Sequence, residues 1–115
     1  MKVRHPAYAG SFYEGSSQSL KAQIESCFTS QLGPRTLPKV SSGRLKHAVG
    51  LMSPHAGYMY SGPVAAHAYA KLAEDGFPET CVILGPNHHG YGSAVALTTE
   101  TFSTPLGEVP VNVEI

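Results

Sequence analysis

The stretch CVILGPNHH, residues 81–89, joins an uninterrupted apolar run to a Gly-Pro pair and two histidines. Its first four residues include two β-branched side chains and show no polar alternation, which is typical of a strand buried on both faces and therefore parallel. The Gly-Pro pair ends the run. Side chains just beyond the carboxyl end of a parallel strand face the ligand crevice, so we expect the Asn-His-His that follows to lie there.

A second segment has the same build, because apolar residues 48–52 are followed at once by Ser, Pro and His55. Between the two runs the sequence predicts a helix that starts at Ser61 as N-cap and ends at Gly76. Strand, helix and strand form a βαβ unit, whose right-handed crossover makes the strands parallel and aims both carboxyl ends the same way. Adjacent strands lie about 4.8 Å apart, so we expect the imidazoles of His55 and His88 to share one rim.

The remaining helix and strands are predicted from hydrophobic periodicity and from the glycine and proline residues that end an element. An amphipathic pattern predicts a helix over residues 16–32, capped by a serine and stopped by Gly-Pro, that covers one face of the sheet. Residues 93–98 and 109–113 are further strand candidates, joined by the turn-forming TPLG, and Pro110 indicates an edge. We expect residues 1–15 to form an ordered arm that packs at least one aromatic side chain, and residues 35–47 a polar loop ending in an exposed His47.

Composition narrows the class of protein. The chain has 115 residues, 42% of them hydrophobic, and no net charge, so we expect one α/β domain without the charge pattern of a nucleic-acid or membrane partner. A signal peptide and an apolar membrane span are not evident, which favours a cytoplasmic protein. Cys27 and Cys81 are expected to be buried thiols. A strand-like end at Ile115 suggests the N-terminal portion of a larger domain; the sequence does not set the oligomeric state.

Two histidines at paired strand ends indicate a metal or catalytic site. A mononuclear iron(II) oxygenase needs two histidines and one carboxylate, and zinc hydrolases accept a similar set. No acidic residue lies in either motif. Glu100, Glu108 and Glu114 come nearest in sequence, and we expect them to be solvated. Spacing alone does not choose between His88 and His89.

Five blocks of the chain resemble the Memo family, in the same order as in that family. They are HPAYAGSFY (5–13), SPHAGYMYSG (53–62), AAHAY (65–69), ILGPNHHG (83–90) and TPLGEVPV (104–111). The family looks like a relative of the class III extradiol dioxygenases of the LigB type, which use non-haem iron(II). The resemblance implies a three-layer α/β sandwich with a mainly parallel central sheet flanked by helices, of which this chain is an N-terminal part.

The resemblance also implies roles for particular residues. His55 and His88 correspond to metal ligands, and His89 is then a catalytic acid/base or supporting group. The third ligand position, a cysteine in Memo proteins and a glutamate in the dioxygenases, comes from a later part of those sequences, so we expect this chain alone to bind metal weakly. The substrate-binding residues that the likeness implies are Phe12, Tyr58, Tyr60 and Asn87.

Three functions are compatible with these features. The first is a redox enzyme that depends on non-haem iron or copper and acts on a small molecule. The second is a binding protein that holds a peptide or phosphopeptide in the same pocket without turnover, as the resemblance to animal members implies. The third is a zinc-dependent hydrolase. The sequence alone does not establish that the protein is an enzyme.

Overall fold

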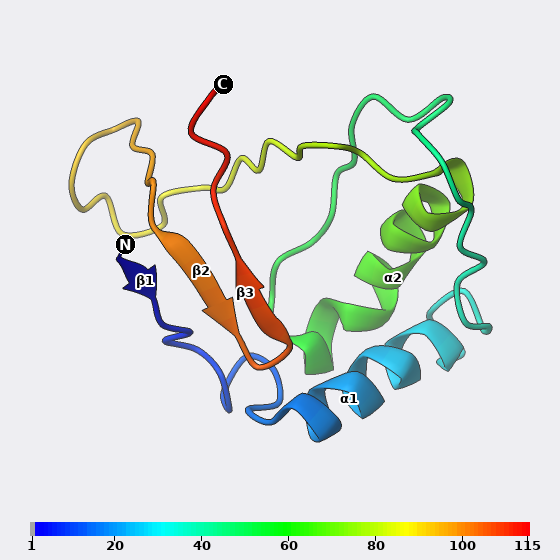
Figure 1. Cartoon of the computed structure of the whole chain (residues 1–115). Coiled ribbons are helices and arrows are strands. Elements are labelled where there is room, and N and C mark those ends of the chain that lie inside the picture. Colours follow the sequence, from blue (N-terminus) through cyan, green and yellow to red (C-terminus); the bar gives the residue numbers. More distant parts are fainter. Residues whose placement is uncertain (1) are drawn as a thin grey trace.

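Two helices and a small mixed sheet make up the regular part of the chain, and the helices lie together on one side of the sheet (Figure 1). The structure is a computed structural model and describes residues 2–115. The sheet has the strand order β1-β2-β3, with β1 parallel to β2 and β2 antiparallel to β3. This arrangement confirms the predicted α/β class. The elements are β1 (Val3–Arg4), α1 (Ser17–Thr29), α2 (Tyr58–Asp75), β2 (Thr101–Thr104) and β3 (Gly107–Val109).

Helix α1 forms where its pattern predicts it. Ser16 is the N-cap, and its side-chain oxygen accepts a hydrogen bond from the backbone N–H of Ser19 at 3.1 Å. The helix ends at Thr29, three residues before the predicted end, with Ser30 as C-cap. The residues that α1 buries, Leu20 and Cys27, belong to the apolar stripe expected from the sequence.

Helix α2 begins at Tyr58 with Gly57 as N-cap, so the predicted start at Ser61 was wrong. The hydroxyl of Ser61 instead donates to the carbonyl oxygen of Ala56 at 3.0 Å. Pro63 is inside the helix, where it lacks the N–H that a helical residue donates four positions back. Gly76 ends the helix with φ of 139°, a conformation that favours glycine.

The two helices meet at a close contact. A Cβ atom added at Gly62 of α2 would overlap the sulfur of Cys27 on α1. Gly62 and Ala66 are both buried, and they stand one turn apart on the same face of α2. Small residues on this face therefore allow the helices to approach each other and bury the core residues Leu20, Cys27 and Ala66.

The sheet joins the two ends of the sequence. Val3 pairs with Thr101 in a parallel register, so the N-terminal arm is ordered as predicted. β2 and β3 form a hairpin in which Thr104 pairs with Gly107, which confirms the predicted turn. The strand predicted over residues 109–113 was misplaced, because β3 ends at Val109 and the following proline has no N–H to donate. The strand predicted over residues 93–98 is not formed.

The segments 48–52 and 81–84 are not strands in the structure, so this part of the predicted βαβ unit was wrong. Both run without regular structure, and Val82, Ile83 and Leu84 are 76–91% exposed. Their apolar character satisfies the local requirement for a buried strand, but a strand also needs a neighbour that pairs its N–H and C=O groups. No such neighbour occurs over residues 2–115. For the same reason Cys81 is exposed, whereas Cys27 is buried as predicted.

The loop before residues 48–52 is tied to the end of α2. The carboxylate of Asp75 accepts backbone hydrogen bonds from Ala48, His47 and Lys46 at 2.9–3.1 Å. These bonds, that of Ala48 first and that of His47 next, lower the pKa of Asp75 because they stabilise its charged form. The side chain of His47 is exposed, as expected.

No helix over residues 2–115 is both long and apolar enough to cross a bilayer.

Candidate metal centre and aromatic cavity

The imidazoles of His55 and His88 lie together, although 33 positions separate them in the sequence. Their Nε2 atoms are 2.9 Å apart, and their ring centroids are 5.1 Å apart with an angle of 36° between the planes. Both residues are exposed. The convergence predicted from the sequence is therefore present without the paired strands that were expected to produce it.

Local hydrogen bonds fix the segment that carries His55. This segment leads directly into α2, and the Ser61 side chain returns from the helix to bond the carbonyl of Ala56. The first helical N–H, that of Tyr58, donates to the carbonyl oxygen of Phe12 at 2.8 Å. The start of α2 is thereby attached to the N-terminal arm, and His55 lies three residues before this attachment point.

His88 lies in a tight turn that Asn87 organises. The side-chain oxygen of Asn87 accepts from the N–H of Gly90, and its side-chain nitrogen donates to the carbonyl of Tyr91, both at 2.9 Å. Gly90 has φ of 69°, which glycine adopts without strain. His89 points to another part of the turn, where its ring stacks on Tyr91 at 5.8 Å.

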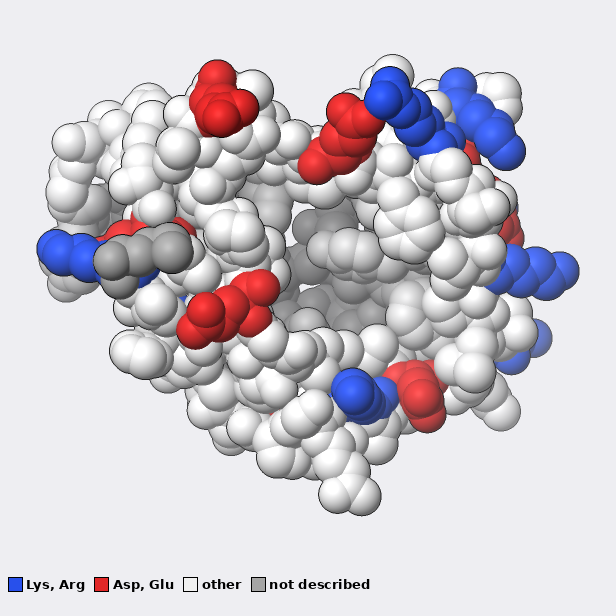
Figure 2. Space-filling model, in the orientation of Figure 1, with Lys and Arg blue, Asp and Glu red and all other residues white. Residues whose placement is uncertain are grey.

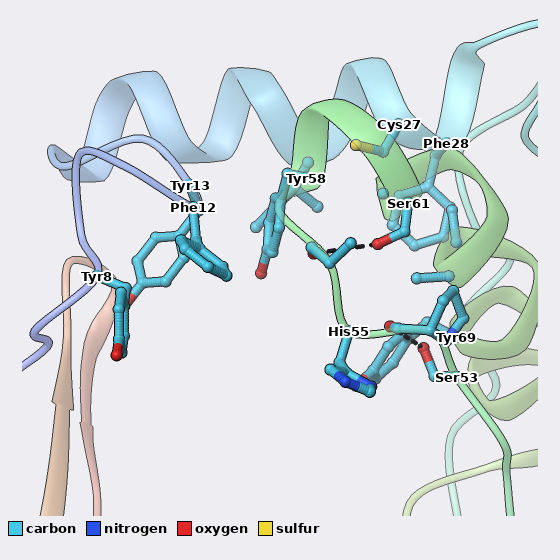
Figure 3. A pocket seen from close by; sticks show the side chains of 16 residues that line it. Tyr8, Phe12, Tyr13, Cys27, Phe28, Ser53, His55, Tyr58, Ser61 and Tyr69 are labelled. Carbon is cyan, nitrogen blue, oxygen red and sulfur yellow. Dashed lines mark hydrogen bonds between the residues drawn. The ribbon is translucent and has the colours of Figure 1, made fainter. Parts of the chain in front are cut away.

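A cavity of about 590 Å³ adjoins His55. Figure 3 shows aromatic side chains of the N-terminal arm on one side, Tyr58 of α2 between, and His55 and Tyr69 on the opposite side. In Figure 2 this face of the molecule is hollowed at its centre, and charged side chains lie around the rim. The lining residues are Tyr8, Phe12, Tyr13, Ile24, Cys27, Phe28, Ser53, Pro54, His55, Ala56, Tyr58, Ser61, Gly62, Ala65, Ala66 and Tyr69.

The cavity wall is rich in aromatic side chains. Its lining contains no lysine, arginine, aspartate or glutamate among the described residues. The hydroxyls of Ser53 and Ser61 are already donated to backbone carbonyls. Burial, followed by the neighbouring Tyr69 and Tyr13, raises the pKa of Tyr58, and burial raises the pKa of Cys27. Both groups are therefore neutral at pH 7, and the cavity suits an uncharged, ring-shaped or apolar group.

The structure places only part of the predicted substrate set at the cavity. Phe12 and Tyr58 line it, whereas Tyr60 is 80% exposed and is not among the lining residues. Asn87 and His89 belong to the 87–91 turn and are also outside the lining. Tyr69, which sequence reasoning missed, does line the cavity.

Helical periodicity could have identified the correct residues. Gly62, Ala65, Ala66 and Tyr69 lie 4, 7, 8 and 11 positions after Tyr58, which is one face of a helix. Tyr60 is two positions from Tyr58 and so points to a different side. Placing the helix start at Ser61 hid this pattern.

The imidazole pair fits a shared metal ion. Metal to imidazole bonds are about 2.1 Å long, so two such ligands at a right angle have nitrogens about 3.0 Å apart, and about 3.4 Å apart at a tetrahedral angle. The observed 2.9 Å is near the right-angled value and is also the length of a direct hydrogen bond between the two rings. No cluster of three or more His, Cys, Asp or Glu side chains suited to a metal occurs over residues 2–115, so the described part of the chain offers two ligands.

Fold and site together define an α/β protein in which two accessible imidazoles meet at the wall of an aromatic cavity. The sequence profile described as Memo-like protein matches residues 4–115. The chain belongs to the Memo family, as its motifs predict.

Archaeal relatives support this assignment. A MEMO1 family protein of Methanothermobacter thermautotrophicus is 52% identical over 98% of this chain and 40% of its own length. Those of Methanopyrus kandleri and Sulfurisphaera tokodaii are 53% and 51% identical over 96% and 98% of the chain, covering 39% and 40% of their own lengths. The chain thus spans about 40% of the length of these relatives.

Proposed function

We propose that His55 and His88 are two protein ligands of a redox-active metal, iron or copper, in a non-haem enzyme related to the extradiol dioxygenases. The observation that carries the proposal is the 2.9 Å separation of the two Nε2 atoms beside the cavity. Neutral imidazole nitrogens are common ligands of both metals. When bound, the metal would supply one-electron chemistry and a site for O₂.

The resemblance to the extradiol dioxygenases supports this proposal over a zinc hydrolase, because those enzymes use non-haem iron(II). Imidazole nitrogens are ligands of iron, copper and zinc alike, so the pair itself fits all three metals. Two histidine ligands leave several positions for water, substrate and a further protein ligand. In the family resemblance that further ligand is a cysteine or glutamate, and over residues 2–115 no third side chain joins the pair.

The cavity supports a small substrate with an aromatic or apolar body. The rings of Phe12, Tyr13 and Tyr58 would contact the aromatic or apolar part of the substrate and exclude water from it. His55, which belongs to both the cavity and the imidazole pair, would orient the reacting end toward the metal. His89, beside the ligand His88 and exposed to solvent, could exchange protons with water.

A phosphopeptide is a poorer match for this cavity. Phosphate recognition usually employs arginine or lysine, and neither lines the cavity in the described residues. An uncharged aromatic side chain of a peptide would still fit. The binding-protein alternative therefore predicts affinity for the ring without dependence on metal.

Titration with Co²⁺ and with Fe²⁺ under anaerobic conditions, on tag-free protein, tests the proposal. We expect one equivalent to bind weakly, because the described residues supply two ligands, and a His55→Ala, His88→Ala variant to lose that binding. A His5→Ala, His47→Ala variant is the matched control, because it also removes two exposed histidines. Equal binding by all three proteins would refute the proposal.

Oxygen consumption in the presence of a catechol then distinguishes the redox enzyme from the metal-independent binding protein. An enzyme of this type should consume O₂ with a catechol only when iron is bound. Catechol affinity that is unchanged by chelation, with no O₂ consumption, would assign the cavity to metal-independent binding.

A further inference from the structure

The sequence Asn-His-His offers two adjacent histidines, and the structure presents only one of them to His55. Side chains of consecutive residues point in different directions, so only one of His88 and His89 can face His55 in a given conformation of the turn. His88 lies against His55, and His89 lies on Tyr91. Some feature of the turn must therefore determine which imidazole joins the pair.

The side chain of Asn87 closes this turn at two points. Its Oδ1 accepts from the N–H of Gly90, and its Nδ2 donates to the carbonyl of Tyr91, each at 2.9 Å. The two bonds connect the residue before the histidine pair to the two residues after it. An amide is required for this, because one atom must accept while the other donates.

The surroundings give the turn little other support. Residues 81–97 are exposed throughout, so packing contributes little to its shape. Apart from the Asn87 bonds, the ring contacts of the turn are that between His55 and His88 and that between His89 and Tyr91. The positive φ of Gly90 lets the chain bend sharply enough for the Asn87 side chain to reach both backbone groups.

We propose that Asn87 is a positioning residue that selects His88 over His89 as the partner of His55. This inference rests on the proposed metal pair and replaces the expectation that Asn87 contacts substrate. Asn87 touches neither the cavity lining nor the pair itself, and it acts through the backbone of the turn.

The test compares Asn87→Ala with Asn87→Asp and a control, Asn112→Ala. Alanine removes both bonds, whereas aspartate keeps the acceptor for Gly90 and loses the donor to Tyr91. Asn112 is the control because its side chain also accepts a backbone N–H and donates once, and neither partner belongs to the 87–91 turn. Both asparagines are on the surface, where the fold tolerates change.

Co²⁺ titration gives the first readout. Loss of a supporting partner typically weakens metal binding about 10–100-fold, which we expect for Asn87→Ala, with Asn87→Asp also weakened and Asn112→Ala unchanged. In the native background His88→Ala should weaken binding strongly, with one imidazole ligand left, and His89→Ala should leave binding unchanged. In the Asn87→Ala background His89→Ala should reduce the residual binding, an exchange of ligands that mere loosening of the turn would not produce.

Proton NMR on the metal-free protein supplies an independent readout. Nuclear Overhauser contacts between the rings of His55 and His88 should be present in the native chain and in Asn112→Ala, and lost in Asn87→Ala. If the native protein binds no metal but shows this pattern, the metal proposal fails and the positioning role stands. Ring contacts and affinity that are unchanged in Asn87→Ala would overturn the positioning role.

Discussion

Replacing Gly62 by alanine tests the close approach of α1 and α2. The new Cβ would overlap the sulfur of Cys27, while its next neighbours, at 3.5 and 3.6 Å, are ordinary contacts. Overpacking of this kind costs about 1–3 kcal/mol, and alanine recovers about 1 kcal/mol of helix propensity relative to glycine. We therefore expect Gly62→Ala to lower the free energy of unfolding by about 1 kcal/mol, or the melting temperature by about 4 °C.

A double-mutant cycle isolates the cause. Cys27→Ala alone removes one buried atom and should cost about 1 kcal/mol. In the double variant the Cβ at position 62 occupies the space left by the sulfur, so the stability should return near that of the native chain. The coupling energy is then about 2 kcal/mol, within the range measured for residues in contact.

Urea unfolding followed by circular dichroism at 222 nm measures these differences. Gly50→Ala is the matched control, because nothing lies within 4 Å of the added Cβ. The reasoning is refuted if Gly62→Ala is as stable as the native chain or if the two substitutions are additive.

Three further predictions concern the helices and their loop. The hydrogen bonds to Asp75, led by that from Ala48, lower the pKa of its carboxyl in the folded protein. Their contribution to stability is therefore present above the unfolded pKa of about 3.9 and is lost as the pH falls through the folded pKa. The free energy of unfolding, measured from pH 2 to 6, should show this loss in the native chain and not in Asp75→Asn. Ser16→Ala should lower the free energy of unfolding by about 1 kcal/mol through loss of the N-cap, whereas Ser17→Ala, inside the helix, should change it little; equal effects would contradict the cap assignment. Pro63→Ala should raise stability, because it restores a helical N–H, and thermal unfolding that shows a lower melting temperature would count against this.

Local signals predicted the helices well. The serine cap and apolar stripe of α1 lie within one continuous segment, so the residues that decide the helix are also the residues that form it. The N-cap of α2 was placed four residues late, at Ser61 in place of Gly57, because Ser61 resembles an N-cap and Pro63 resembles a first-turn proline. Here the contact between Tyr58 and Phe12, distant in sequence, determines where the helix begins.

The sheet was less predictable because strands depend on partners. Residues 81–84 have a strand-like composition but remain exposed, whereas β1 pairs across almost the whole sequence with β2. Periodicity in one segment does not report which other segment will supply its hydrogen bonds. The polar segment TFST of β2 has no apolar run and was not predicted as a strand.

The imidazole pair was predicted correctly in position, although its supporting structure was not. A predicted βαβ unit with both strand ends at one rim indicated that His55 and His88 approach one another, and they do, although neither strand forms. The choice between His88 and His89 depends on the Asn87 side chain, whose hydrogen bonds are evident only in three dimensions. The roles of both histidines as ligands stay predictions.

X-ray absorption spectroscopy of the Co²⁺-loaded protein tests the shared metal most directly, because it counts imidazoles around the ion. We predict two imidazoles in the native chain and in His89→Ala, and one in either His55→Ala or His88→Ala. A count that stays the same when His55 or His88 is replaced, or a native spectrum without two imidazoles, would contradict the account.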